Sequence, residues 1–297
     1  MKLEFTKMHG LGNDFVLIDC RGRAVSDRLP AMGDLSRRLC HRRFGVGADQ
    51  VLLLYPSEIA DFKMKIFNAD GSEVEMCGNG IRCFAKYIWD RKISEDDILS
   101  VETAAGIIRP ERHRGMVRVD MGEPVLEPEK IPVKIVRGSQ KNTSHLTPDP
   151  SLLTPDTSAI IDFPLKVEDR EFTITCVSMG NPHAVIFVGD VGSFEVGRYG
   201  PVIERHDLFP NRINVEFIQV LGPDRLKMRV WERGAGETMA CGTGASAAAV
   251  AANLNRFTGK KVTVSVLGGD LEIEWGADNH VYMTGPAEEV FEGRIEI

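Results

Sequence analysis

Short hydrophobic runs, separated by turns rich in Gly, Asn and Asp, recur through both halves of the chain. Runs of this length, either apolar throughout or alternating with polar residues, predict β-strands. They lie at 15–19, 51–55, 62–68, 98–103 and 116–121, and again at 172–177, 184–188, 214–220, 226–232, 261–266, 270–275 and 280–284. Two longer segments, about 78–91 and 242–255, predict helices. The second helix is nearly all Ala and Val and is apolar on every side, so we expect a sheet to surround it.

An internal repeat is the most informative feature of the sequence. Residues 67–80 align without a gap on residues 231–244, which places Cys77 opposite Cys241 at an offset of 164 positions. Further matches follow at nearly the same offset: Val101, Gly106 and Gly122 correspond to Val264, Gly269 and Gly285, and Gly12-Asn13 corresponds to Gly180-Asn181. A near-constant offset over this length favours duplication over chance. The chain is therefore predicted to hold two copies of one domain.

The predicted fold class is α+β, with two pseudo-symmetric domains, each built from strands, a Gly-rich turn, a helix and further strands. A length of 297 residues agrees with two domains of about 150 residues each. The first domain is expected at 1–123, together with a C-terminal strand at about 287–297, and the second at 124–286. A Pro-rich stretch from Pro124 to Pro164 predicts a linker with surface loops, including an insertion at about 139–160.

Composition and charge exclude several classes of protein. With 43% hydrophobic and 27% charged residues, the chain has ordinary globular usage, which argues against disorder. A net charge of −7 without a basic run predicts that nucleic acid is not a partner. The first residues carry no apolar signal segment, and Ala245 to Leu254 is too short to span a bilayer. We therefore expect a soluble, cytoplasmic protein with no membrane partner.

Two of the six cysteines stand out by their context. The chain has no CxxC pair and no zinc-binding pattern, so no metal is expected. Cys77 and Cys241 each lie between a strand with its turn and a helix, followed by Gly-Asn-Gly or Gly-Thr-Gly. The free N–H groups and partial positive charge of a helix N-terminus lower the pKa of a thiol and can hold a carboxylate beside it. The remaining cysteines are expected to be buried and unreactive: Cys20, Cys40, Cys83 and Cys176.

Two matched, activated cysteines indicate inversion at a carbon that bears an acidic proton. Such a reaction needs a base on one face of the carbon and an acid on the other, and one thiolate with one thiol supplies both. The duplication is expected to place Cys77 and Cys241 on facing sides of a cleft between the domains. Amides of both helix N-termini would hold the developing enolate charge, and no cofactor is required.

Other interpretations of the same residues remain open. Gly242 to Ala247 fits a dinucleotide-binding Gly pattern, but about ten residues separate Gly242 from the preceding strand, where that fingerprint needs an immediate turn. A cysteine hydrolase using His183 would not explain two matched cysteines. A dithiol redox protein would use the pair as a disulfide, and a binding module would keep the duplication without chemistry.

The motifs resemble those of the diaminopimelate epimerase family. The matching segments follow in family order at 7–15, 43–50, 67–71, 76–83, 180–183, 212–217, 231–234 and 240–245. They cover nearly the whole chain apart from the Pro-rich stretch, which is long for the family. Proline racemases and hydroxyproline epimerases share the two Cys-Gly-x-Gly motifs but typically carry His where this chain has Asn79.

The resemblance implies interconversion of LL- and meso-diaminopimelate, a small-molecule substrate, in lysine and peptidoglycan-precursor synthesis. It implies that neither pyridoxal phosphate nor a metal takes part. It also implies that each domain is a mixed or antiparallel sheet curled into a barrel around a central α-helix, and that the protein forms a homodimer. The alternative activity is that of a proline- or hydroxyproline-type racemase.

The resemblance also implies a role for individual residues. Cys77 and Cys241 would form the acid–base pair. The other implied residues are Gly78, Asn79, Gly242 and Thr243, which would offer amides to the reacting carboxylate, and Asn13, Gln50, Asn68, Asn181, Asn214 and Arg233, which would form a polar shell. Glu232 would lie near the substrate amine and, with His183, tune the thiol pKa values. Without the resemblance, the Asn and Gly residues could equally form turns, His183 could be a surface histidine, and Glu232 with Arg233 an exposed charge pair.

Overall fold

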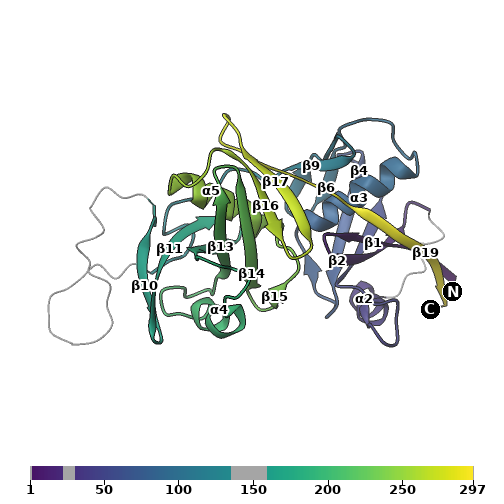
Figure 1. The fold of residues 1–297 in the computed structure, drawn as a ribbon. Helices are drawn as coiled ribbons and strands as arrows, with labels where there is room; N and C mark the ends of the chain where they lie inside the picture. Colours follow the sequence, from purple (N-terminus) through teal and green to yellow (C-terminus); the bar gives the residue numbers. More distant parts are fainter. Residues whose placement is uncertain (1, 23–30, 135–158, 297) are drawn as a thin grey trace. The chain divides into compact units, whose positions relative to one another are not determined.

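The computed structural model describes residues 2–22, 31–134 and 159–296 (Figure 1). The chain divides into two compact units, one comprising Met1–Asp120 with Met283–Ile297 and the other Met121–Tyr282. The division derived from the sequence placed the boundaries after residue 123 and near residue 287. Each unit holds one main helix and one sheet, and each is described by itself below.

The first unit is a mixed sheet that packs around helix α3 (Gly78–Asp90). Its strand order is β19 (Glu288–Glu296), β1 (Lys2–Gly10), β2 (Asn13–Asp19), β3 (Gln50–Tyr55), β4 (Phe62–Asn68), β6 (Val101–Thr103), β7 (Gly106–Ile108), and β5 (Glu73–Val74) pairs with β4. The pairs β2/β3 and β4/β6 are parallel. Helix α2 (Met32–Cys40) contacts β3 and β4, a hairpin forms from β8 (Glu111–His113) and β9 (Met116–Asp120), and α3 contacts β1, β2, β3, β9 and β19.

The second unit is built in the same way around helix α5 (Gly242–Leu254). Its strand order is β10 (Phe163–Val167), β11 (Arg170–Ser178), β12 (Pro182–Phe187), β13 (Asn214–Gly222), β14 (Arg225–Glu232), β16 (Lys261–Val266), β17 (Gly269–Trp275), β18 (Val281–Gly285), and β15 (Gly236–Thr238) pairs with β14. The pairs β12/β13 and β14/β16 are parallel. Helix α4 (Val196–Glu204) contacts β13 and β14, and α5 contacts β11, β12, β13, β14, β16 and β17.

The two units therefore repeat one topology. Parallel pairs occur at the same two places in each strand order, and a short strand pairs with β4 in one unit and with β14 in the other. Each central helix begins directly after the cysteine of its repeat. The prediction of an α+β fold with two pseudo-symmetric domains from a duplication is confirmed.

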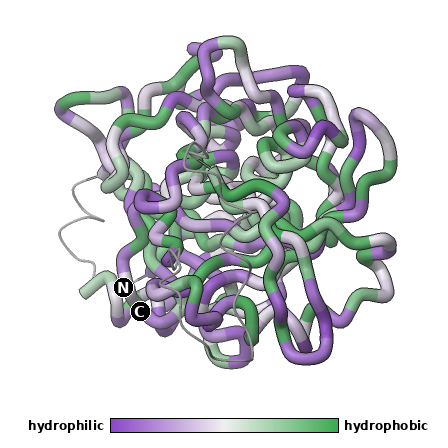
Figure 2. Tube along the Cα trace, turned by 90° about the vertical axis from the view of Figure 1, so that its left-hand side faces the viewer, coloured by the Kyte–Doolittle hydropathy of each residue, from purple (hydrophilic) through white to green (hydrophobic). Residues whose placement is uncertain are grey.

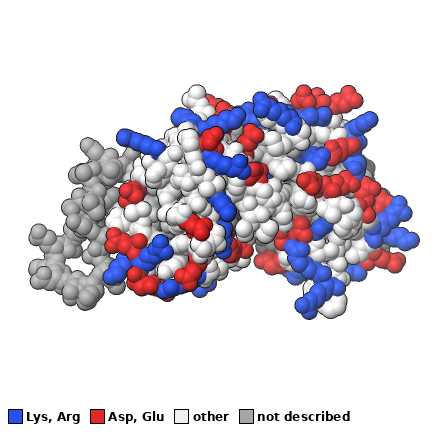
Figure 3. Space-filling model, viewed as in Figure 1, with Lys and Arg blue, Asp and Glu red and all other residues white. Residues whose placement is uncertain are grey.

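The composition of α5 explains why strands surround it. Ten of its 13 residues are buried, and nearly all of these are Ala, Val or Gly, whose small side chains let strands approach on every side. Some strands alternate buried and more exposed residues, such as β4 and β17, whereas β3 and β12 are buried along most of their length. Figure 2 shows hydrophobic and hydrophilic residues interspersed along the chain. On the face drawn in Figure 3, basic and acidic side chains are interspersed. None of the helices in the described ranges is long and apolar enough to cross a membrane.

The sequence analysis was wrong about part of the Pro-rich stretch. Outside residues 135–158, which are not described and include most of the predicted insertion, the stretch is not merely linker and surface loop. Ile131, Val133 and Ile160 are buried in the core of the second unit, and β10 begins at Phe163. The stretch was predicted to be linker because of its prolines. Its apolar residues nevertheless supply core side chains, although they show no strand-like periodicity. The sequence pattern also did not predict the helices α2 and α4 or the strands β1, β5, β7, β8, β10 and β15.

Candidate active site

Both cysteines of the repeat cap a central helix. Cys77 is the N-cap of α3, with φ −139° and ψ 118°, and Cys241 is the N-cap of α5, with φ −122° and ψ 113°. This extended backbone directs the chain into the helix so that the next N–H groups lack intrahelical partners. Gly78 and Asn79 follow in one unit, Gly242 and Thr243 in the other. Each unit thus carries a thiol beside a cluster of backbone donors suited to an anion.

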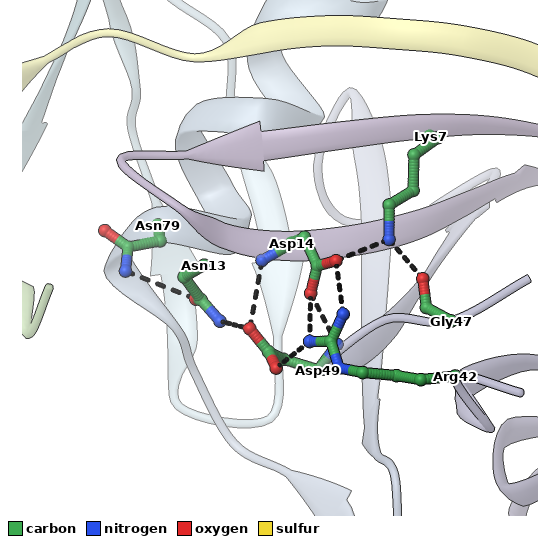
Figure 4. Close-up of polar contacts among 7 residues, drawn as sticks. All are labelled: Lys7, Asn13, Asp14, Arg42, Gly47, Asp49 and Asn79. Atoms are coloured by element: carbon green, nitrogen blue, oxygen red, sulfur yellow. Dashed lines mark hydrogen bonds and ion pairs between the residues drawn. The ribbon is translucent and has the colours of Figure 1, made fainter. Parts of the chain in front are cut away.

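In the first unit, a chain of side-chain amides lies beside Cys77. The thiol of Cys77 donates to Asn13 Oδ1 over 3.8 Å. Asn79 Nδ2 donates to the same oxygen over 3.2 Å (Figure 4). Asn13 Nδ2 donates to Asp49 Oδ2 over 2.8 Å. The orientation of both amides is set by these partners, because an amide nitrogen only donates and a carboxylate only accepts.

Charged residues form ion pairs at the start of β2, the strand that begins with Asn13. Asp14 accepts from Lys7 Nζ and from the guanidinium of Arg42, which also reaches Asp49 (Figure 4). Partial burial opposes ionisation of Asp14, but the hydrogen bonds from Arg42 and Lys7 outweigh it and lower the pKa of Asp14 to about 2. Asp14 therefore stays a carboxylate at any physiological pH, and the position of Asn13 does not change with protonation.

Two further predicted residues of this unit pair with each other. Gln50 at the start of β3 lies opposite Asn68 at the end of β4, and Gln50 Nε2 donates to Asn68 Oδ1 over 2.8 Å. Asn68 Nδ2 in turn donates to Ser72 Oγ. Because β2 and β3 run parallel and begin with Asn13 and Gln50, Asn13 lies at the same end of the strands as this pair. The structure thus gathers four predicted side chains, those of Asn13, Gln50, Asn68 and Asn79, close to one end of the unit.

In the second unit, Cys241 is buried and accepts hydrogen bonds. Its Sγ receives the N–H of Gly244 over 3.3 Å and lies 3.4 Å from Thr243 Oγ1. Burial raises the pKa of Cys241 well above the usual value, the carboxylates of Glu232 and Glu216 raise it further, and the bonds from Thr243 and Gly244 offset only part of this. The prediction of a lowered pKa was wrong for this thiol, because loss of water and two carboxylates outweigh the helix N-terminus. Cys241 carries its proton at neutral pH.

His183 lies fully buried behind Cys241, so its interpretation as a surface histidine was wrong. Its Nδ1 is 2.7 Å from Glu216 Oε1, and its Nε2 is 3.0 Å from Asn181 Oδ1. The side chains of His183 and Glu216 are both 0% exposed. Both ring nitrogens therefore face side-chain oxygen atoms. His183 acts on Glu232, but the groups that act directly on the Cys241 thiol are Glu232 and Glu216.

The remaining predicted residues lie where β13 begins and β14 ends. Asn214 Nδ2 donates to the Pro182 carbonyl, and Asn214 Oδ1 accepts the backbone N–H of Arg233, each over 2.9 Å. Arg233 itself is exposed, and its guanidinium reaches the Asn211 carbonyl. Glu232 accepts from Thr238, and burial raises its pKa despite hydrogen bonds from Thr238 and Cys241. Glu232 and Arg233 therefore point to different partners rather than forming an exposed charge pair.

Three residues around these cysteines were missed by the sequence analysis. Asp49 accepts a hydrogen bond from Asn13, and Arg82 donates one to Asn79. Glu216 is hydrogen-bonded to His183. The repeat could have indicated two of these residues, Glu216 and Arg82. At the offset of 164, Glu216 corresponds to Leu52 and Arg82 to Ser246, so each is a charge at a position where the other copy is neutral.

The second unit leaves less room at its helix N-terminus than the first. A Cβ atom on Gly244 would lie 2.7 Å from Glu216 Oε1 and 3.3 Å from Cys241 Sγ, whereas one on Gly80 would meet Leu52 Cδ2 at 3.2 Å. Alanine is otherwise a better helix former than glycine. Gly244→Ala is therefore expected to lower the free energy of unfolding by about 2 kcal/mol through overpacking, and Gly80→Ala by clearly less. Urea unfolding of the two variants measures this, and equal losses would contradict the assigned packing.

Solved structures share this fold. A phenazine biosynthesis protein of the PhzF family from Bacillus anthracis matches with a TM-score of 0.68 at 18% identity over 100% of each chain. A probable proline racemase from Agrobacterium radiobacter matches with a TM-score of 0.65 at 16% identity, covering 99% of this chain and 93% of that one. At these identities the likeness shows the fold alone. The chain thus has this duplicated α+β fold, with a cysteine at the N-cap of the central helix of each repeat.

Sequence comparison shows the family. The family model described as "Diaminopimelate epimerase" matches residues 5–127 and 175–290. A protein of Moorella thermoacetica named diaminopimelate epimerase is 54% identical over 98% of both chains, and one of Acetivibrio thermocellus with the same name is 47% identical over 99% of both. The chain belongs to the diaminopimelate epimerase family.

Proposed function

We propose that the protein interconverts LL- and meso-diaminopimelate by proton transfer at the α-carbon, with Cys77 and Cys241 as the acid–base pair. One observation carries the proposal: the duplication has kept, in each unit, a cysteine at the N-cap of the central helix followed by Gly-x-Gly. A single activated thiol would serve a nucleophile, whereas two matched thiols serve a reaction with two faces. Membership in the diaminopimelate epimerase family supports the same reaction.

In the proposed reaction, one thiolate removes the α-proton and the other thiol delivers a proton to the opposite face. One C–H and one S–H bond break while one S–H and one C–H bond form, so no electrons are gained or lost. The free N–H groups after Cys77 and Cys241 would hold the substrate carboxylate and the enolate charge that develops on it. The reaction requires that the two units close on one substrate molecule.

The polar residues of both units suit an amino acid that is charged at both ends. Neutral amides, such as those of Asn13, Asn68 and Asn214, can orient ammonium and carboxylate groups without fixing either by a strong charge. The exposed guanidinium of Arg233 is available for the distal carboxylate, which it can bind in a bidentate manner. Glu232 would serve the substrate ammonium. A ligand without the distal group would leave these residues unpaired, which gives selectivity.

Four further statements belong to the proposal. The reaction uses neither a cofactor nor a metal, its place is in lysine and peptidoglycan-precursor synthesis, the protein acts as a homodimer, and neither nucleic acid nor a membrane is a partner. A cytoplasmic location is also part of the proposal.

Proton NMR in D₂O tests the reaction directly. Reduced enzyme free of pyridoxal phosphate is incubated with LL-diaminopimelate, and with L-proline and 4-hydroxyproline in parallel. We expect deuterium at the α-carbon of diaminopimelate together with the meso isomer, and none in the prolines. Exchange only with a proline-type substrate would assign the protein to the racemase alternative. No exchange with any substrate, with the thiols verified as free, would contradict both.

A further inference from the structure

Arg82 is fully buried in the first unit and has no carboxylate partner among the described residues. The side chain is 0% exposed, on the second turn of α3. Its Nη2 donates to Asn79 Oδ1 over 2.8 Å, its Nη1 to the Gly78 carbonyl over 3.2 Å, and its Nε to the Pro286 carbonyl over 3.1 Å. All these acceptors are neutral. A buried charge normally pairs with an opposite charge, so a lone guanidinium here needs an explanation.

Most charged residues on the described strands that contact α3 form ion pairs with residues other than Arg82, and Lys2 and Glu296 on β1 and β19 form none with it. In the described part of the strands that contact α3 they form the pairs Lys7–Asp14, His9–Glu288, Asp19–Arg21, Arg91–Glu289, Arg91–Glu292, Arg118–Glu111 and Arg294–Glu4, and Asp120 has contacts of its own. β3 carries no charged residue. The ionisable groups that act on Arg82 are the thiols of Cys83 and Cys77. Burial raises the pKa of Cys83 to about 12. Cys77 is the thiol at the N-cap of the helix that carries Arg82.

The duplication shows that this charge is specific to the first repeat. Ser246 occupies the corresponding position on α5 and makes the corresponding bond, from its hydroxyl to the Gly242 carbonyl four residues back. Arg82 makes the same backbone contact but adds a positive charge and a bond to Asn79. Gly10 leaves the space for it, since a Cβ there would lie 3.1 Å from Arg82 Nη2.

The second repeat carries negative charge where the first is neutral. Glu216 occupies the position of Leu52. Glu216 lies against Gly244, the third residue of α5, and Leu52 lies against Gly80, the third residue of α3. Glu232 occupies the position of Asn68. Cys77 therefore lies near an unpaired guanidinium, and Cys241 lies near two carboxylates.

We propose that Arg82 is a positioning residue that makes the two cysteines unequal: its guanidinium favours the thiolate of Cys77 and fixes the Asn79 amide, whereas Cys241 holds its proton among carboxylates. The free enzyme is then poised with a base in the first unit and an acid in the second. This form, with Cys77 as thiolate and Cys241 as thiol, can react at once with the substrate isomer whose α-proton faces Cys77. The opposite isomer requires the proton to move to Cys77 first.

The proposal rests on the proposed function for the roles of the two thiols, but it is tested by thiol chemistry without turnover. Only the thiolate reacts with iodoacetamide, so the rate of alkylation against pH reports the ionisation of each cysteine. Peptide mass spectrometry follows Cys77 and Cys241 separately in the same reduced, substrate-free protein. We expect the midpoint for Cys77 to lie at lower pH than that for Cys241. Coincident midpoints, or a lower one for Cys241, would overturn the proposal even if epimerase activity were proven.

Substitutions at Arg82 separate its charge from its packing. Arg82→Met keeps the length and removes the charge, Arg82→Gln keeps a donor for Asn79, and Arg82→Lys keeps the charge. A nearby opposite charge is expected to shift the midpoint by about 1 pH unit or more. Met and Gln should therefore raise the midpoint of Cys77 by that amount and leave Cys241 unchanged, while Lys restores most of the shift. Ser246→Ala is the matched control in the second unit and should move neither midpoint.

The remaining outcomes of these experiments also test the proposal. A folded Arg82→Met protein, checked by circular dichroism, whose Cys77 midpoint is unchanged would show that Arg82 only packs and would overturn the proposal. Equal shifts of both cysteines would do the same, because they would indicate a general loosening. If the Met and Gln variants do not fold, the comparison of Cys77 with Cys241 in the unaltered protein and the Lys variant still tests it.

Discussion

Cys77→Ala and Cys241→Ala are each expected to reduce net conversion of LL- to meso-diaminopimelate by about 10³-fold or more. Each substitution removes the proton donor or acceptor of one face, and no other thiol can replace it. Cys83 is the nearest alternative in sequence, but it is fully buried and its pKa is about 12. The measurement is the initial rate at saturating substrate, which separates loss of kcat from loss of binding.

Isotope exchange sharpens this prediction. A variant with one thiol left can still remove and return a proton on a single face. Cys241→Ala is therefore expected to exchange the α-proton of one isomer with D₂O while keeping its configuration, and Cys77→Ala to do so with the other isomer. Cys20→Ala and Cys176→Ala are matched controls, since both thiols are buried and free, and both should retain activity. Normal epimerisation by either active-site variant would rule out the two-thiol reaction.

The sequence was sufficient to predict the fold because the repeat constrains it. Helix bounds of 78–91 and 242–255 were predicted, and the helices end at Asp90 and Leu254. The strands with regular alternation, such as β4 and β17, were found nearly to the residue. β1 was missed because Lys2 to Gly10 alternates weakly and includes the buried polar residues Thr6 and Lys7. Only its pairing with β2 and β19, which come from opposite ends of the chain, makes it a strand.

The environment of the candidate site was harder to predict than its residues. The motif placed both cysteines at helix N-termini, but a lowered thiol pKa does not follow from the backbone alone. Glu216 lies 25 residues before Cys241 in the sequence, and it approaches the thiol only because β13 runs beside α5. Neither its burial nor its contact with His183 could be deduced from residue spacing. The sign of a pKa shift depends on such distant neighbours, so it requires the folded chain.

The pair formed by His183 and Glu216 is expected to be among the most sensitive in the second unit. Glu216→Leu introduces the residue found at the same position of the first repeat, where Leu52 is fully buried. In the second unit this leaves His183, which is 0% exposed, without its partner at 2.7 Å. Leaving a fully buried polar group without its hydrogen-bond partner is expected to lower the free energy of unfolding by about 2 kcal/mol. Urea unfolding measures the loss.

A double-mutant cycle and the thiol assay assign that loss to its cause. Glu216→Leu, His183→Leu and the double variant should give a coupling energy of about 1 kcal/mol or more, since the double variant removes both partners of this buried hydrogen bond. Removing the carboxylate of Glu216 also removes one of the groups that raise the pKa of Cys241, so the alkylation midpoint of Cys241 should move to lower pH. Glu216→Gln, which keeps a hydrogen-bonding group but no charge, should move the midpoint in the same direction with a smaller loss of stability. Additive losses with an unmoved midpoint would show that Glu216 only fills space, and that the opposite charges of the two repeats do not reach their cysteines.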